Sequence, residues 1–168
     1  MAINPRRKVF ISYHHAGDQI YYDYFSKNFG TNYDVFYDNS LDRARDSEDE
    51  GYILRYIREN HLTGSSCLIV LCGADTWGRK YVDWEIKAAL DQNMGVLAIQ
   101  LPTLKPDIHG NINVPGRLAD NINSGYALLE DWVAATNTLQ GLSDLIEESL
   151  KRSKALINNT RARRQRNG

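Results

Sequence analysis

The stretch 66-SCLIVLCG-73 is short and continuously apolar, and it lies between a serine and a glycine. A strand that is covered on both faces carries apolar residues at successive positions, whereas a strand with one wet face alternates. The length of the run favours a strand over a helix. We therefore predict that residues 66–73 form a central strand of a parallel sheet.

Strand and helix patterns alternate on both sides of this central strand. Four further β-rich runs predict strands over residues 8–13, 33–38, 96–101 and 126–132. Helical spacing of apolar residues predicts helices over residues 18–29, 79–93 and 138–157. Alternation of this kind predicts an α/β fold, an open parallel sheet of about five strands with helices on both faces. Ligands of such sheets bind at the carboxyl edge of the strands.

The connections between these elements carry their own signals. An acidic loop over residues 38–51 follows the second predicted strand, and Ser47 and Glu50 within it have the spacing of a capping box that opens a helix. Gly95 is placed to end the helix over 79–93. Proline, glycine and asparagine residues predict an irregular loop over residues 102–123.

Composition bounds the class of protein. The 168 residues, of which 42% are hydrophobic and 24% charged, suit one globular domain. A net charge of −1 argues against a nucleic-acid partner, and no apolar run is long enough to predict a membrane span. Cys67 and Cys72 lie in one predicted strand with side chains on opposite faces, so they cannot bridge each other. We expect a cytoplasmic protein with reduced thiols.

The end of the sequence is basic. Residues 151–168 contain seven lysine and arginine residues and no acidic residue. A terminus of this composition is usually solvated. We therefore expect one domain over residues 1–157 and a flexible basic tail over residues 158–168.

Several kinds of site have no matching motif in the sequence. The chain has no glycine-rich phosphate loop and no GxSxG nucleophile turn. A phosphorelay receiver would need acidic residues where the chain has 13-YHH-15 after the first strand and Cys72-Gly73 at the end of the central one. The four histidines lack metal-ligand spacing with the cysteines, and we expect no metal.

The helix over 79–93 places one carboxylate on its apolar side. Its polar stripe is formed by Lys80, Asp83, Lys87 and Asp91. At about 100° per residue, Glu85 projects to nearly the opposite side. No residue three or four positions away on the same helix carries a positive charge. We therefore expect Glu85 to be directed toward the interior.

An inward carboxylate has two interpretations. It can be structural, bonded to a backbone amide or to a side chain on another element. It can also be catalytic, although one glutamate cannot supply the acid and base of an ordinary glycosidase. A single carboxylate suffices when the leaving group departs unaided, as nicotinamide does from NAD, because the oxocarbenium-like sugar that remains can be stabilised by one negative charge.

Separated blocks of the sequence resemble the TIR-like family, and within it the bacterial branch found in Thoeris anti-phage defence. The blocks are 8-KVFISYHHAGD-18, 66-SCLIVLCG-73, 76-TWGRKYVDWEIKAAL-90 and 114-VPGRLADNINSGYALLEDW-132. The resemblance covers about residues 7–150. It implies a flavodoxin-like fold and cleavage of NAD at the nicotinamide–ribose bond, with Glu85 as the catalytic residue. In this branch the ADP-ribose is closed into a cyclic isomer, a second messenger for a separate effector protein.

The resemblance also implies residues that bind NAD, which is the substrate rather than a tightly bound cofactor. The candidates are Phe10, Ser12, Tyr13, Asp38, Asn39, Trp77, Tyr81 and His109. Phe10 can equally be core, the two aromatic residues near Glu85 can be packing, and Asp38 and Asn39 can cap a turn. His109 is either a proton carrier or an exposed side chain.

The resemblance implies self-association, because TIR-type sites are often completed by a second subunit. Two alternatives remain open. One is a non-catalytic TIR module that docks partner proteins through its loops. The other is an enzyme like the nucleoside deoxyribosyltransferases, which use a glutamate nucleophile in a related sheet.

Overall fold

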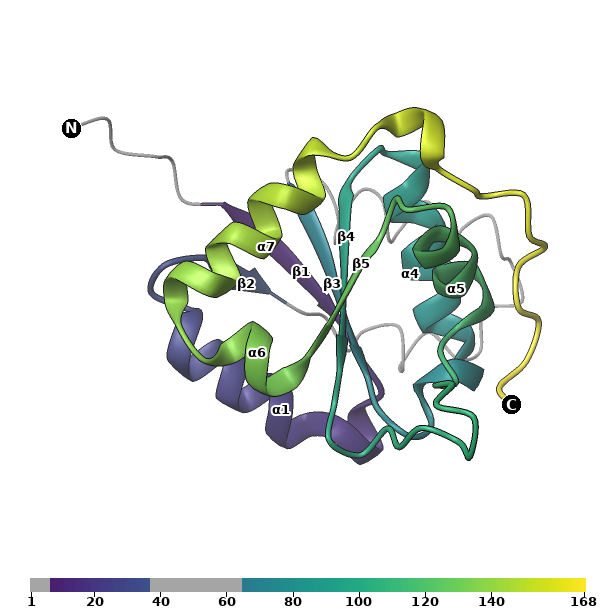
Figure 1. The fold of residues 1–168 in the computed structure, drawn as a ribbon, viewed down its shortest axis with the longest axis horizontal. Helices are drawn as coiled ribbons and strands as arrows, with labels where there is room; N and C mark the ends of the chain where they lie inside the picture. Colours follow the sequence, from purple (N-terminus) through teal and green to yellow (C-terminus); the bar gives the residue numbers. More distant parts are fainter. Residues whose placement is uncertain (1–6, 37–64) are drawn as a thin grey trace.

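The chain forms an α/β fold around one parallel sheet, seen in a computed structural model that describes residues 7–36 and 65–168. The strands are β1 (Lys8–Ser12), β2 (Asp34–Phe36), β3 (Cys67–Cys72), β4 (Gly95–Gln100) and β5 (Leu128–Asp131). Their order in the sheet is β2-β1-β3-β4-β5, and every pair is parallel (Figure 1). The predicted fold class is confirmed.

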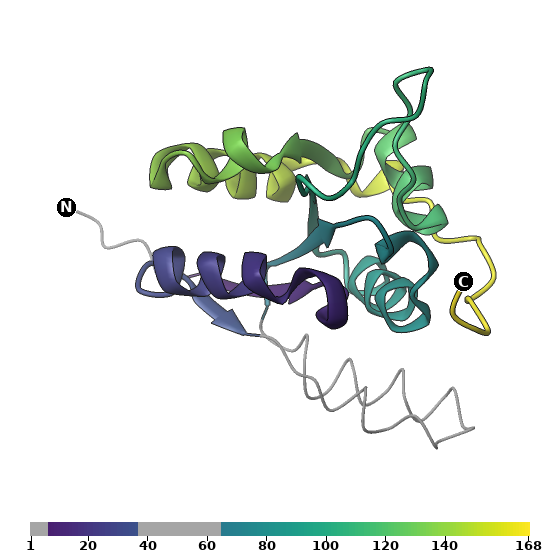
Figure 2. The same cartoon turned by 90° about the horizontal axis from the view of Figure 1, so that it is seen from below.

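Helices cover both faces of the sheet. The α-helices of the described residues are α1 (His15–Phe29), α4 (Lys80–Asp91), α5 (Gly116–Asn123), α6 (Trp132–Thr136) and α7 (Leu139–Lys151). Two short 3₁₀ helices are η3 (Thr76–Gly78) and η4 (Lys154–Leu156). Figure 2 shows three layers, with α4 and α5 on one face of the sheet and α1, α6 and α7 on the other. Each face has its own apolar core.

The central strand β3 is buried at all six positions, as its continuous apolar sequence predicts. Its cysteines face opposite cores, Cys67 toward α1 and α7 and Cys72 toward α4. Burial raises the pKa of the Cys67 thiol to about 11 and that of Cys72 to about 12. Both thiols are therefore protonated at neutral pH and behave as core residues.

The predicted loop over 102–123 is wrong in its second half, where α5 begins at Gly116. The glycine and asparagines of this segment disfavour a helix in isolation, but tertiary contacts stabilise one. Leu118 is fully buried in the core, and the side-chain amide of Asn121 donates to the carbonyl of Asn158 at 2.7 Å. Pro115 immediately before the helix was the available signal, because proline is favoured at helix starts.

The ends of two predicted helices also differ from the structure. Helix α4 stops at Asp91, and Asn93 takes the left-handed conformation expected of a stop residue, with φ 56°. Gly95 instead begins β4, where a Cβ atom would lie 2.6 Å from the Ser149 hydroxyl of α7. Glycine is needed there for the close approach of α7. Helix α7 ends at Lys151 rather than at residue 157.

Two further findings concern the remaining sequence predictions. The acidic loop over 38–51 and the helix after Ser47 and Glu50 lie outside the described residues. Across residues 7–36 and 65–168, each helix falls short of the length and apolar character that a bilayer crossing requires.

Candidate functional site

The carboxyl ends of β1, β3 and β4 meet at one edge of the sheet, with the segments that follow them (Figure 1, lower edge). These segments are residues 13–14, residues 73–79 and the loop over 101–115. Helix α4 begins at this edge and runs back along the sheet. Residues in its first turns therefore lie beside the ends of the strands, which is where open parallel sheets bind ligands.

Glu85 is buried on α4, with 6% of its surface exposed. Val82 and Ala89, which are three and four positions away and therefore share its side of the helix, are both buried in the core on this face of the sheet. Glu85 lies five residues after Lys80, about 7.5 Å along the helix axis. The direction predicted from helical periodicity is confirmed, whereas the catalytic role stays a prediction.

Asp83 is buried, although its spacing predicts a position on the polar stripe of α4. It is 5% exposed, and its carboxylate receives hydrogen bonds from Arg117 Nε at 2.9 Å and Nη2 at 3.4 Å. Arg117 is fully buried on α5. Helix α5 covers this side of α4, so a position that is polar by periodicity is occupied by a buried ion pair.

The first strand contributes Phe10 and Ser12 to the same face of the sheet as Glu85. Phe10 is fully buried in the core that contains Val82 and Trp84, which supports its interpretation as a core residue. Ser12 is 1% exposed at the carboxyl end of β1, and its hydroxyl makes no hydrogen bond to any described residue. Buried hydroxyls nearly always have a partner. An unsatisfied one at the edge where ligands bind marks a place that a ligand group can fill.

Tyr13 belongs to the opposite face of the sheet from Glu85. It packs in the core on the α1 side, and its hydroxyl donates to Gln19 Oε1 at 2.8 Å. Its ring stacks on Tyr22 with centroids 5.0 Å apart. The structure therefore does not bring Tyr13 together with Glu85, because successive strand residues point to opposite faces.

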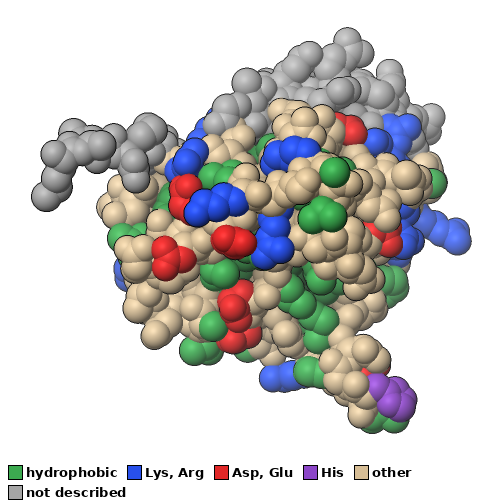
Figure 3. Space-filling view, turned by 45° about the horizontal axis from the view of Figure 1, so that its top comes forward, with side chains coloured by type: hydrophobic (Ala, Val, Ile, Leu, Met, Phe, Trp, Pro, Cys, Tyr) green, Lys and Arg blue, Asp and Glu red, His purple; other side chains and the backbone are tan. Residues whose placement is uncertain are grey.

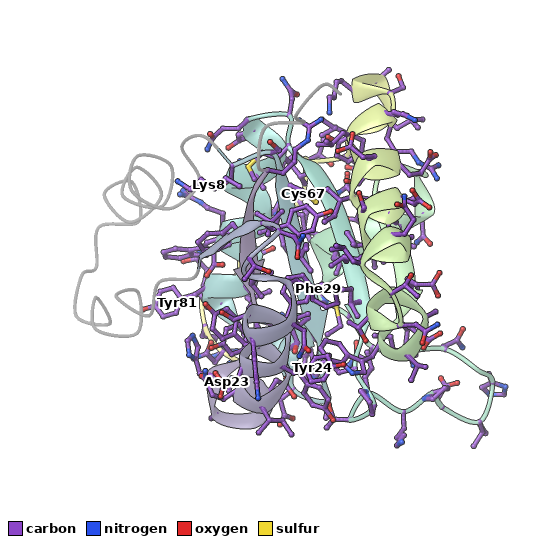
Figure 4. The ribbon with its side chains drawn as sticks, turned by 90° about the vertical axis from the view of Figure 1, so that its left-hand side faces the viewer. Lys8, Asp23, Tyr24, Phe29, Cys67 and Tyr81 are labelled. Atoms are coloured by element: carbon purple, nitrogen blue, oxygen red, sulfur yellow. The ribbon has the colours of Figure 1, made fainter. Side chains whose placement is uncertain are left out.

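Trp77 and Tyr81 flank the start of α4, and both are half-buried. The guanidinium of Arg164 lies over the Trp77 ring, 5.3 Å from its centroid. Tyr81 meets Trp84 edge-on, with ring centroids 5.8 Å apart. Figure 4 places Tyr81 on the side of the sheet away from α7. Both aromatic residues thus have packing partners, and Tyr81 lies one helical turn before Glu85.

The loop over residues 101–115, which contains His109, projects from the body of the molecule (Figure 2). His109 is exposed, and its backbone amide donates to Asp107 Oδ1 at 2.8 Å. The structure does not bring it to Glu85, and this position favours the interpretation of an exposed side chain. Asp38 and Asn39 lie outside the described residues.

Asp18 is a residue of this edge that sequence reasoning missed. It is 2% exposed in the first turn of α1, and it accepts a hydrogen bond from the Thr103 hydroxyl at 3.3 Å. A Cβ atom at Gly73 would overlap its carboxylate, so glycine at the end of β3 leaves room for Asp18 in this position. Burial raises the pKa of Asp18, although hydrogen bonding to Thr103 opposes this. From the first turn of α1, Asp18 lies against Gly73 after β3 and accepts from Thr103 after β4, so it connects the segments that follow β1, β3 and β4.

The C-terminal segment, residues 158–168, was expected to be a solvated tail and instead packs along α5 and α4 (Figure 1). The carbonyl of Arg164 accepts a hydrogen bond from the Trp84 indole at 2.8 Å, and the amide of Arg164 donates to Asp83 at 2.8 Å. Basic composition alone does not reveal this packing. The asparagines within the segment, which cap and bridge backbone groups, were the available signal.

The fold and this edge define a flavodoxin-like α/β protein whose candidate ligand site is built by β1, β3 and α4. The sequence matches the family model described as Thoeris protein ThsB, TIR-like domain, over residues 10–106. The chain belongs to this family. The matched span contains Phe10, Ser12, Trp77, Tyr81 and Glu85. A search of curated proteins returned no significant match.

Proposed function

We propose that the chain is an NAD-consuming enzyme in which Glu85 is the catalytic carboxylate. The observation that carries this proposal is the burial of Glu85 on α4, the helix that covers the face of the sheet to which the unsatisfied hydroxyl of Ser12 belongs. Membership of the ThsB TIR-like family supports it, because the matched span includes both residues.

The proposed first step breaks the bond between nicotinamide and the ribose carbon. The bonding electron pair leaves with the nicotinamide nitrogen, so a positively charged ring departs as a neutral molecule and needs no proton. Positive charge develops on the sugar, and the carboxylate of Glu85 stabilises it. A buried site strengthens this interaction, because the surrounding low dielectric screens charge less than water does.

The proposed second step closes ADP-ribose into a cyclic isomer. A ribose hydroxyl of the same molecule attacks the carbon that nicotinamide left, a C–O bond forms, and the hydroxyl proton is released. This outcome requires that the dinucleotide be folded back and that water be excluded from the carbon. The cyclic product then acts as a second messenger that activates a separate effector protein in anti-phage defence.

The test is nicotinamide release from NAD by the purified protein, followed by chromatography and mass spectrometry of the ADP-ribose product. Glu85→Gln removes the negative charge at nearly constant volume and is expected to lower the rate by at least about 100-fold, as loss of a transition-state stabiliser does. Glu148→Gln is the matched control, because Glu148 is exposed on α7. Wild-type protein that leaves NAD intact would contradict the proposal.

A further inference from the structure

The C-terminal segment is bonded to α5 and to the middle of α4 before it reaches the start of α4. The Asn121 side chain on α5 donates to the carbonyl of residue 158 at 2.7 Å and accepts from its amide at 2.9 Å. The Asn159 side chain donates to the Lys87 carbonyl at 3.2 Å and to Asp91 Oδ1 at 2.8 Å. These bonds use the nitrogen and the oxygen of the Asn121 amide and the nitrogen of the Asn159 amide, so they fix the direction of the segment as well as its place.

The same segment completes the buried ion pair between α4 and α5. Arg117 donates to Asn159 Oδ1 at 2.8 Å and to the Ala162 carbonyl at 3.2 Å, in addition to its two bonds with Asp83. Asp83 accepts the backbone amide of Arg164 at 2.8 Å. A buried charged pair is stable only when its remaining hydrogen-bonding groups are satisfied. The segment supplies those groups, so its packing is tied to the core.

The end of the segment caps the first turn of α4. This helix has no side-chain cap of its own at Arg79. The amide of Lys80, one of the groups that a helix start leaves unsatisfied, donates to Asn167 Oδ1 at 2.9 Å. Asparagine is among the best N-cap residues, and here it lies 87 residues after the amide that it caps.

The segment also clamps η3, which connects the end of β3 to α4. The carbonyl of Gly78 accepts from Arg164 Nε at 2.9 Å and from the Gly168 amide at 2.8 Å. The Arg164 guanidinium covers the Trp77 ring, and the Trp84 indole donates to the Arg164 carbonyl. Arg164 thus contacts η3 and α4 through its side chain, its amide and its carbonyl.

We propose that residues 158–168 are a positioning segment that holds η3 and the first turn of α4, and thereby the orientation of Glu85. The expected effect of this segment on catalysis rests on the proposed function. Glu85 lies little more than one turn after the capped amide of Lys80, so a shift of the helix start moves its carboxylate. Small displacements of a catalytic group lower rates strongly. The segment acts through α4 and does not itself contact NAD.

The first measurement is hydrogen exchange in the full chain, which needs no assumption about activity. Asn167→Ala removes the acceptor of the Lys80 amide and is expected to speed exchange in residues 80–83 by about fivefold, the equivalent of one lost helix cap. Asn167→Asp, which caps equally well, is expected to restore slow exchange. The start of α7, capped internally by the Thr138 hydroxyl on the Gly141 amide, is the control region. Unchanged exchange at residues 80–83 in Asn167→Ala would overturn the proposal.

The second measurement is nicotinamide release by the same variants. Asn167→Ala, and more strongly Arg164→Ala combined with it, are expected to lower kcat by about fivefold or more with little change in KM, while Asn167→Asp retains the wild-type rate. Asn137→Ala, an exposed asparagine between α6 and α7, is the matched control. Faster exchange with an unchanged kcat would refute positioning. Absence of NAD cleavage by the wild type would refute the proposed function, and hydrogen exchange would still decide whether the segment orders α4.

Discussion

Glu85 is a carboxylate that is buried in helix α4. An ionised group of its size carries a desolvation cost of several kcal/mol when it is buried, and Glu85 is 6% exposed. In the proposed reaction, a buried carboxylate is needed because it stabilises the positive charge that develops on the sugar. The unsatisfied hydroxyl of Ser12 on the same face of the sheet has the same explanation, because a bound ligand would supply its partner.

Asp18 is expected to make stability depend on pH. Burial raises its pKa above the ordinary value of 3.8, so the folded state binds its proton more tightly than the unfolded state does. Its contribution to stability is therefore full below pH 3.8 and is lost as the pH rises through the folded-state pKa. Asp18→Asn, which retains an oxygen to accept from Thr103, should melt at an equal or higher temperature than the wild type at pH 7.

The control for this prediction has the opposite sign. Backbone hydrogen bonds from Asn111 and His109 lower the pKa of Asp107, so its contribution is present above pH 3.8 and is lost as the pH falls. Thermal melts between pH 3 and pH 7 measure the pH dependence of stability to which Asp18 and Asp107 contribute. A melting temperature of Asp18→Asn that falls further below the wild type as the pH rises would show that the ionised carboxylate is stabilising.

The sequence predicted the direction of Glu85, because helical periodicity needs only neighbouring residues. It did not predict Asp18, whose partners Gly73 and Thr103 come from the ends of two other strands. It misplaced Asp83 for the same reason, since Arg117 lies on a helix that the sequence analysis did not expect. Local patterns assign a residue to a face of its element, but only tertiary contacts show what covers that face.

Within the described part of the chain, helix α4 is covered by the sheet, α5 and the C-terminal segment. Buried residues therefore occupy almost all of its length, including the polar position of Asp83. This coverage explains why Asp83 is buried, although the other members of the predicted polar stripe are half-buried or exposed. The helix pattern depends on spacing, whereas exposure depends on elements far away in the sequence.

The ion pair between α4 and α5 is expected to hold the two helices together. Asp83→Ala leaves Arg117 buried without its carboxylate and should lower the free energy of unfolding by about 3–5 kcal/mol. Asp83→Leu combined with Arg117→Met replaces both charges and should recover most of that loss. Urea unfolding measures each variant.

An exposed pair between the C-terminal segment and α5 is the control for this prediction. Arg161 Nε and Asp120 lie 2.8 Å apart, with side chains 50% and 24% exposed. Arg161→Ala should cost less than about 1 kcal/mol, because solvent screens such pairs. Equal losses for Asp83→Ala and Arg161→Ala would contradict the assignment of the buried pair as the main link between the helices.

At the scale of the whole molecule, the alternation of strands and helices was sufficient to predict the sheet. Four of the five described strands fall within predicted strand segments, and β4 begins one residue before its segment, at Gly95. The packing of the C-terminal segment could not be predicted, because it depends on surfaces that exist only after α4 and α5 have folded together. Figure 3 shows basic and acidic side chains intermingled on the face it presents, in keeping with a net charge of −1.

The exposed apolar side chains of α1 and α6 are a candidate surface for the proposed self-association. Ile20 and Val133 are each 69% exposed, and Tyr24, itself 47% exposed, contacts Trp132 with ring centroids 5.6 Å apart. The contact between Tyr24 and Trp132 joins α1 and α6 into one surface. Exposed apolar side chains that lie together on a surface often mark interaction sites.

Specific activity is therefore expected to rise with protein concentration, and Ile20→Glu should abolish most of that rise. Leu156→Glu on η4 is the control, since Leu156 is also partly exposed but lies far from α1 and α6 (Figure 1). The measurement is nicotinamide release over a wide range of protein concentrations, with sedimentation of each variant. Activity strictly proportional to concentration would count against assembly.

The most direct measurement of the central claim is nicotinamide release from NAD by wild type, Glu85→Gln and Glu148→Gln at equal concentration. We predict release by the wild type and Glu148→Gln, and a loss of at least about 100-fold in Glu85→Gln with its melting temperature retained. Release by Glu85→Gln at the wild-type rate would show that the buried carboxylate is structural.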